Sequence, residues 1–223
     1  MRIISKTKLN SEMWKIVLDS PLIASKALPG NFAFLKMDET AEGAQLAIND
    51  PDPAKGTITV IFQETDQTAP RLEALNEGDL LPGISGPAGE PVDFGYVGNV
   101  LLVADGAGIA DIISVARYAK EMKNRVVTIL SARTKDLLIL ENELKKYSDK
   151  LITSTSDGSY GRKGPIIEPL EDIIRFEPFN ICYTAVPETI LKAVCNITNR
   201  HRLKTIGCGR NFRDTSVIND RGA

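Results

Sequence analysis

Hydrophobic residues in the first ninety positions occur in short runs, separated by segments rich in Pro, Gly, Asn and Asp. Three runs carry β-branched or aromatic residues with partial alternation, at 13–19, 32–38 and 57–63. Turn-forming segments at 29–31 and 49–56 lie between them, and a helical interlude is expected at 69–76. This pattern predicts a small antiparallel β-barrel.

After residue 95 the pattern changes to apolar runs that alternate with helical spacing. Strands are predicted at 99–104, 125–131, 151–154, 180–185 and 204–206, and helices at 109–122, 135–146, 166–176 and 188–199. Such alternation indicates an α/β domain with a five-stranded parallel sheet. We therefore expect a barrel domain at 1–95, an α/β domain at 96–206 and a polar C-terminal tail at 207–223.

Composition narrows the class of protein without naming a reaction. The chain has 223 residues, of which 43% are hydrophobic, and a formal net charge of −2. This charge gives no attraction to nucleic acid or to an anionic membrane. No run approaches the ~18 apolar residues of a membrane span, and the first residues lack a signal-peptide core, so we expect a cytoplasmic protein.

Cysteine and histidine are too sparse to suggest a metal site or acid–base catalysis. Three cysteines occur, at 182, 195 and 208, and their wide spacing forms no ligand motif. Cys182 and Cys195 are expected to be buried structural thiols. The single histidine, His201, stands in a polar stretch and is expected at the surface. No metal ligands and no catalytic residues are predicted.

Three segments carry a resemblance to one family. Residues 86–91 read GPAGEP, residues 131–138 read SARTKDLL, and residues 155–164 read TSDGSYGRKG. Together they resemble the ferredoxin–NADP reductase superfamily. Within it the chain is similar to electron-transfer subunits, such as the small subunit of NADH-dependent ferredoxin:NADP oxidoreductase, its sulfide dehydrogenase counterpart and the dihydroorotate dehydrogenase electron-transfer subunit. The resemblance covers about residues 1–206.

The resemblance implies FAD between the domains, NAD(P)H on the second domain and a [2Fe-2S] cluster in a cysteine-rich extension. Such a cluster needs four soft ligands. Only Cys208 follows residue 195, so no cluster is expected.

Two of the implied FAD contacts are altered. Gly43 stands where the family places an arginine, and glycine cannot make the bidentate phosphate contact of a guanidinium. Asp66 stands in the pyrophosphate loop where a glycine is usual. Gln63 and Thr68 remain as candidate FAD contacts, and FAD held by Thr68 and backbone amides stays open as an alternative.

The nucleotide loop after the first parallel strand is altered as well. Gly106 and Gly108 keep part of the glycine pattern, but Asp105 and Asp111 flank the helix start. A carboxylate there repels phosphate by roughly 1–4 kcal/mol per close pair. Either these aspartates replace the phosphate as partners of the helix N-terminus, or Asp111 points to solvent. Further along, Val186 stands where the family has glycine.

A third loop keeps the family form and is the best candidate for residual nucleotide binding. The resemblance implies contacts to the adenosine end of NAD(P)(H), or to another adenine nucleotide. We expect the cations of this group beyond the ends of parallel strands, where ligands of such sheets gather. A solvated surface turn is the alternative. The candidate residues are Arg133, Asp157, Gly158, Ser159, Arg162 and Lys163.

Two functions are consistent with these observations. The first is an electron-transfer subunit of a multi-subunit NAD(P)H-linked flavin oxidoreductase, with impaired cofactor binding. The alternative is a non-catalytic structural or regulatory subunit that keeps the reductase fold to bind a redox partner. Both predict protein subunits of a redox complex as partners, and neither predicts nucleic-acid binding or membrane insertion.

Overall fold

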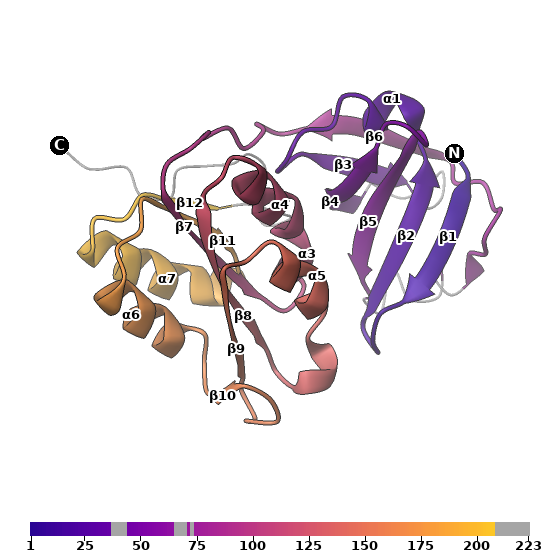
Figure 1. Cartoon of the computed structure of the whole chain (residues 1–223). Helices are drawn as coiled ribbons and strands as arrows, with labels where there is room; N and C mark the ends of the chain where they lie inside the picture. Colours follow the sequence, from indigo (N-terminus) through magenta and orange to yellow (C-terminus); the bar gives the residue numbers. More distant parts are fainter. Residues whose placement is uncertain (37–43, 65–70, 72–73, 208–223) are drawn as a thin grey trace.

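The computed structural model describes residues 1–36, 44–64, 71 and 74–207. Two β-sheets form the frame, the first antiparallel and the second parallel with helices on both faces (Figure 1). This is the predicted order of an antiparallel half followed by an α/β half.

The first sheet has six strands in the order β1-β2-β5-β4-β3-β6, and every pairing is antiparallel. A short helix, α1 (Pro21–Ala24), follows β2. The strands are β1 (Ile3–Lys8), β2 (Met13–Asp19), β3 (Phe32–Lys36), β4 (Ala44–Asp52), β5 (Thr57–Gln63) and β6 (Gly83–Ala88).

The predicted turn at 49–56 is wrong in its first half. Strand β4 continues to Asp52, because Asp50, Pro51 and Asp52 still pair with β5 after a register shift beyond Ile48. Such a bulge lets a strand keep its partner across residues that disfavour regular pairing. The helical interlude expected at 69–76 falls mostly outside the described residues.

The second sheet has six strands in the order β10-β9-β8-β7-β11-β12, all paired in parallel. The five predicted strands are confirmed, and a two-residue strand, β10, extends the edge beside β9. The strands are β7 (Asn99–Asp105), β8 (Arg125–Ala132), β9 (Lys150–Thr155), β10 (Arg162–Lys163), β11 (Ile181–Ala185) and β12 (Thr205–Gly207).

Two of the four predicted helices are interrupted. The first divides into α3 (Gly108–Asp111) and α4 (Ile113–Glu121). The second consists of a 3₁₀ turn (Lys135–Leu137) and α5 (Glu141–Lys146), separated at Leu140, whose φ of 55° is left-handed. The other two, α6 (Ile167–Phe176) and α7 (Glu188–Arg200), are continuous and agree with the prediction.

Three hydrophobic clusters hold these layers together. One fills the antiparallel half, and another joins α6 and α7 to one face of the parallel sheet. The third lies on the opposite face, against α3, α4 and α5. It includes Met13 of β2, Ile61 of β5 and Val92, so side chains of the antiparallel half pack into a core of the α/β half.

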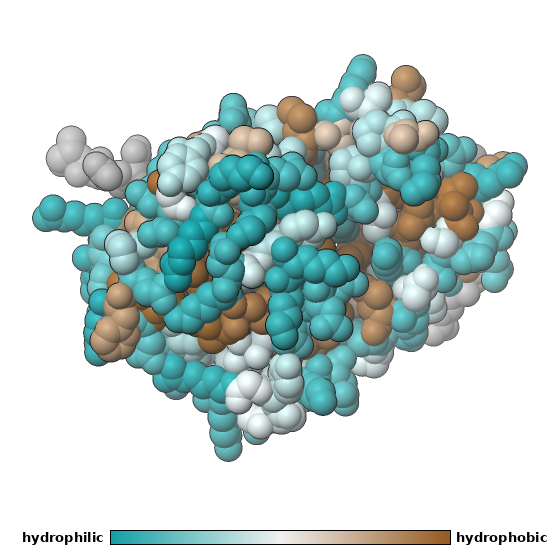
Figure 2. Space-filling model, viewed as in Figure 1, coloured by the Kyte–Doolittle hydropathy of each residue, from teal (hydrophilic) through white to brown (hydrophobic). Residues whose placement is uncertain are grey.

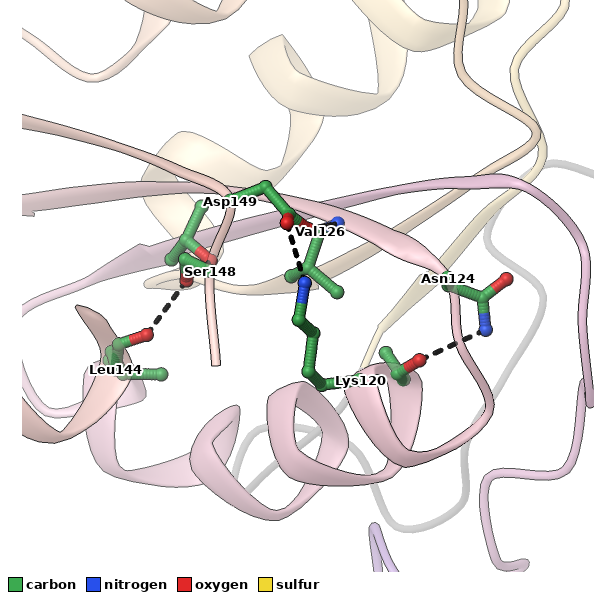
Figure 3. A network of polar contacts seen from close by, with 8 residues as sticks. Lys120, Asn124, Val126, Leu144, Ser148 and Asp149 are labelled. Atoms are coloured by element: carbon green, nitrogen blue, oxygen red, sulfur yellow. Dashed lines mark hydrogen bonds and ion pairs between the residues drawn. The ribbon is translucent and has the colours of Figure 1, made fainter. Parts of the chain in front are cut away.

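A polar network secures the edge of this third layer (Figure 3). Lys120 of α4 forms an ion pair of 2.5 Å with Asp149, whose other oxygen accepts a 2.8 Å hydrogen bond from the backbone N–H of Val126. Ser148 donates to the carbonyl of Leu144, 2.8 Å away. The network therefore ties α4 to the beginning of β8 and to the turn between α5 and β9.

The face in Figure 2 is mainly hydrophilic, with hydrophobic residues visible in separate patches. Among the described residues, no helix is both long and apolar enough to cross a membrane.

Candidate functional site

A cleft of about 540 Å³ lies where the two sheets meet. From the antiparallel half it is lined by the β1–β2 turn and by the ends of β2 and β5. From the α/β half it is lined by the loops that follow β7, β8 and β11. These loops end parallel strands, which is where open α/β sheets place their ligands. The lining residues are Asn10, Glu12, Met13, Gln63, Asp105, Gly106, Ala107, Gly108, Asp111, Ala132, Arg133, Leu137, Ala185, Val186, Pro187 and Glu188.

The charge of this cleft is mainly negative. Its described lining carries four carboxylates, from residues 12, 105, 111 and 188, and one guanidinium, from Arg133. Arg133 forms an ion pair with Glu12 across the cleft, joining the end of β8 to the β1–β2 turn. The only cation on the described lining is therefore already engaged by a carboxylate of the same chain.

Asp105, the last residue of β7, lies half-buried beside Ser131 of β8. Burial raises the pKa of its carboxyl, and a hydrogen bond with Ser131 and the charge of Arg133 oppose that rise without cancelling it. The raised pKa means that removing water disfavours the ionised form more than its neighbours stabilise it. An added phosphate would increase this cost.

Asp111, the last residue of α3, is only 4% exposed. The alternative in which it points to solvent is therefore wrong. Asp111 lies on the cleft lining together with Asp105, so two acidic side chains occupy the region where the loop was expected to receive phosphate. The sequence did not show this burial, because it arises from the packing of the one-turn helix α3 against β4 and β11, which are distant in the chain.

The two retained glycines have different roles. Gly106 has a φ of 57° and open space around the position of a Cβ, so it serves the turn. Gly108 packs against β11, and a Cβ there would lie 1.9 Å from the carbonyl oxygen of Ala185. Gly108 is thus required for the fold, and its presence does not indicate a ligand.

The loop after β11 closes the cleft from the other side. Val186 is 1% exposed and Pro187 precedes α7 as its N-terminal cap residue. The valine side chain packs in the hydrophobic cluster beneath α6 and α7, so its role in the structure is that of a core residue.

The third candidate loop lies outside this cleft. Asp157 accepts hydrogen bonds from the backbone N–H of Ser159 at 2.9 Å and from its hydroxyl at 2.7 Å. These bonds, the one from the hydroxyl above all, lower the pKa of the Asp157 carboxyl. Ser159 in turn accepts a 2.8 Å bond from the backbone N–H of Lys135. Gly158 has a φ of 81°. These bonds order the loop internally.

The prediction that Arg162 and Lys163 lie beyond a strand end is wrong. Both form β10 and pair with Ser154 and Thr155 at the end of β9. Arg162 forms ion pairs with Asp172 and, at 3.4 Å, with Glu168, both on α6. Lys163 is exposed. The structure therefore does not bring these residues to the cleft that holds Gly106, Gly108 and Arg133.

The residues expected to hold FAD are only partly described. Gln63 ends β5, is exposed and lines the cleft. Gly43, Asp66 and Thr68 lie outside the described residues, as does Cys208. Cys182 is buried as predicted, whereas Cys195 is only half-buried, and His201 is exposed. Within the described ranges no three acidic, histidine or cysteine side chains gather to hold a metal ion.

Sequence reasoning missed the contribution of the β1–β2 turn. Asn10 donates a 3.3 Å hydrogen bond to the carbonyl of Leu137, and Glu12 binds Arg133. Both links join residues more than 120 positions apart. The only signal was a short polar turn before the strand, which by itself indicates nothing about a site.

Comparison with known proteins reveals clear relatives, although no protein-family profile matches. The chain is 35% identical over 198 residues to a Thermotoga maritima dihydroorotate dehydrogenase B (NAD(+)) electron transfer subunit homolog, covering 89% of this chain and 70% of that one. A probable electron transfer subunit of the same enzyme from Methanocaldococcus jannaschii is 32% identical over 162 residues, and the match spans 68% of this chain and 61% of that relative's length. Among solved structures, that of an NADH-dependent reduced ferredoxin–NADP oxidoreductase, studied for flavin-based electron bifurcation, superposes with a TM-score of 0.85 at 31% identity, over 92% of this chain and 74% of the other.

Proposed function

The chain belongs to the ferredoxin–NADP reductase-like electron transfer subunits related to dihydroorotate dehydrogenase B, and we propose that it acts as such a subunit with an impaired nucleotide cleft. In this proposal it assembles with a larger oxidoreductase subunit. Electrons are then exchanged between a flavin held by the antiparallel half and that partner.

The proposal that nucleotide binding is impaired rests on the residues of the cleft between the two sheets. A pyridine dinucleotide brings a pyrophosphate, and oxyanions are bound by free backbone N–H groups, helix N-termini and unpaired cations. Here Asp105 and Asp111 line the cleft instead, and Arg133 is paired with Glu12. The residues present do not fit a nucleotide phosphate, so no step of the proposed function uses a nucleotide in this cleft.

The flavin part rests on family membership and on the described end of β5. Gln63 is exposed at the cleft, on the side where the antiparallel half faces the loop after β7. A bound flavin would supply the hydride and single-electron chemistry. This chain would contribute the surface that holds it and the inter-sheet packing that fixes its position relative to the partner.

A second candidate is a non-catalytic subunit that keeps the reductase shape to hold a redox partner. The same four carboxylates favour it, because they change the cleft while leaving packing residues such as Gly108 in place. A retained scaffold beside an altered site is the pattern expected of a subunit that has lost its catalytic activity but still binds its partner.

Flavin content and partner binding separate the two candidates. The full chain is purified, its flavin absorbance is recorded before and after incubation with FAD, and co-purification with a catalytic subunit from its native cells is examined. One equivalent of FAD together with a stable complex supports the electron-transfer subunit. A colourless protein that still forms the complex supports the second candidate, and a protein that forms no complex contradicts both.

A further inference from the structure

A second, smaller cleft of about 160 Å³ lies between the two halves and shares no lining residue with the first. Strands β2, β4 and β5 form one wall, and α4 with the region around α5 forms the other. Both helices lie on the side of the parallel sheet that faces the antiparallel half (Figure 1). The lining consists of Lys15, Asn49, Asp50, Thr59, Ile61, Ile113, Arg117, Leu140, Glu143, Lys146 and Tyr147.

Two lysines on opposite walls line this cleft. Lys15 of β2 pairs with Ile61 of β5, and Met13, two positions earlier on β2, packs with Ile61 in the core that the two halves share. Because alternate residues of a strand share a face, Lys15 faces the α/β half. On the other wall Lys146 lies three residues after Glu143 on α5, on the same face of that helix. The two ammonium groups therefore come from separate halves of the molecule.

The third cation of the lining, Arg117 of α4, is engaged by other side chains. Its guanidinium forms a 2.6 Å ion pair with Asp50 and a hydrogen bond with Tyr147. The lysines differ from it, because neither Lys15 nor Lys146 forms an ion pair with any residue that the structure describes. Both remain able to pair with a ligand.

The charged lining of this cleft is net positive. It carries three cations and two carboxylates, a net charge of +1, in a chain whose formal net charge is −2. With Arg117 and Asp50 paired to one another, two lysines and the carboxylate of Glu143 remain. The first cleft has the opposite sign, with four carboxylates and one guanidinium. Of the two clefts, the smaller one therefore favours an anion.

We propose that the smaller cleft binds a free oxyanion of the phosphate type between Lys15 and Lys146. Each ammonium is a compact charge that pairs with a phosphate oxygen, and the hydroxyl of Thr59 on the same lining can donate a further hydrogen bond. A volume of about 160 Å³ is well below the ~300–1,000 Å³ of pockets that hold larger ligands, so the anion alone fits better than a nucleotide. The bound anion connects the antiparallel half to α5.

Nitrogen–proton correlation spectra of the full chain test this proposal, with inorganic phosphate titrated in place of chloride at constant ionic strength. The backbone signals of Thr59 and Lys146, on opposite walls, should shift saturably and together, with a dissociation constant in the roughly millimolar range. Constant ionic strength keeps the general screening of charges the same at every point. Adenosine monophosphate should bind more weakly than inorganic phosphate, and ammonium should produce no saturable shift.

Charge-removing variants locate the response. Lys15→Gln and Lys146→Gln should each weaken phosphate binding about tenfold, because each removes one charge-assisted contact. Glu143→Gln removes the remaining carboxylate and should strengthen binding. Lys145→Gln is the matched control, since Lys145 is an exposed residue of α5 outside the lining, and it should leave the affinity within about twofold. Signal dispersion in each spectrum shows whether the variant is folded.

Three results would overturn the proposal: no signal responds to phosphate, ammonium shifts the same signals, or Lys145→Gln weakens binding as much as Lys146→Gln. Tighter binding of adenosine monophosphate than of inorganic phosphate would also overturn it, because the cleft would then hold more than the free anion. The site is independent of the function proposed above. A negative phosphate titration leaves the flavin and partner experiments unaffected, and a colourless protein leaves the phosphate titration unaffected.

Discussion

Gly108 and Ala185 are in direct backbone contact: a Cβ on Gly108 would lie 1.9 Å from the carbonyl oxygen of Ala185. No rotation of a side chain relieves this approach, because the obstructing atom belongs to the main chain of β11. The loop after β7 can therefore approach the end of β11 this closely only because residue 108 has no side chain.

Replacing Gly108 by Ala should destabilise the protein by about 3 kcal/mol or more, because α3 or β11 must move. Gly106→Ala is the matched control, since nothing lies within 4 Å of its Cβ position and the φ of 57° costs only about 1–2 kcal/mol. Urea unfolding of both variants gives the comparison. Equal losses at the two positions would contradict the packing role of Gly108.

The carboxylate of Asp105 should limit nucleotide binding. Asp105→Asn removes one negative charge from the cleft at nearly constant shape, so NADH affinity measured by calorimetry should rise at least about fivefold. The gain should shrink at high salt. Glu121→Gln, on α4 and outside the cleft lining, should change nothing. An Asp105→Asn affinity equal to that of the unmodified chain would show that this charge does not face the nucleotide.

Glu12 should compete with a nucleotide phosphate for the guanidinium of Arg133. Glu12→Gln frees the guanidinium, and NADH affinity should rise several-fold, because a charge-assisted bond contributes about 1.5–3 kcal/mol. Adding Arg133→Ala should remove that gain. The free energy of unfolding should change by less than about 1 kcal/mol, since the Arg133 side chain is 70% exposed. A gain that persists without Arg133 would assign it to another residue.

Stability should fall as the pH rises through the titration of Asp105. Burial raises the pKa of this carboxyl above its ordinary value of 3.8, so the folded state binds the proton more tightly than the unfolded state. The contribution of protonated Asp105 to the free energy of unfolding is fully present below pH 3.8. It is lost as the pH rises through the folded-state pKa of this carboxyl. Asp105→Asn should therefore gain stability relative to the unmodified chain between the two values, as measured by urea unfolding across that range. A constant difference at every pH would contradict the raised pKa.

Flavin affinity should respond to the two substituted positions that the sequence identifies. Gly43→Arg with Asp66→Gly should tighten FAD binding roughly ten- to a hundredfold, because an arginine fork pairs with phosphate and a glycine admits it. Gly43→Lys with Asp66→Gly is the control, since it adds the charge without the fork. Fluorescence quenching of FAD reports both affinities. If the unmodified chain already binds one equivalent of FAD tightly, other contacts are sufficient to hold the flavin.

The sequence predicted the parallel half well because its central strands are mainly apolar and its helices carry regular spacing. The burial of all five residues of β11 is an example. It did not predict β10, whose two exposed residues carry no strand pattern, or the continuation of β4 through Pro51. Both depend on a neighbouring strand. Gly106, Gly108 and Arg133 line the cleft, but the sequence named Arg133 as a partner of the third loop, and their contact with a cofactor stays a prediction. Glu12 and the burial of Asp111 arise from contacts between distant parts of the chain, which the sequence does not show.

Met13 and Ile61 of the antiparallel half lie in the same hydrophobic cluster as the buried residues of β7 and α4. Separating the two halves would expose that shared interior to water, and neither half could keep it covered alone. The protein should consequently lose both sheets in one step on heating. Its calorimetric and van't Hoff enthalpies should then agree, as they do for a single cooperative unit.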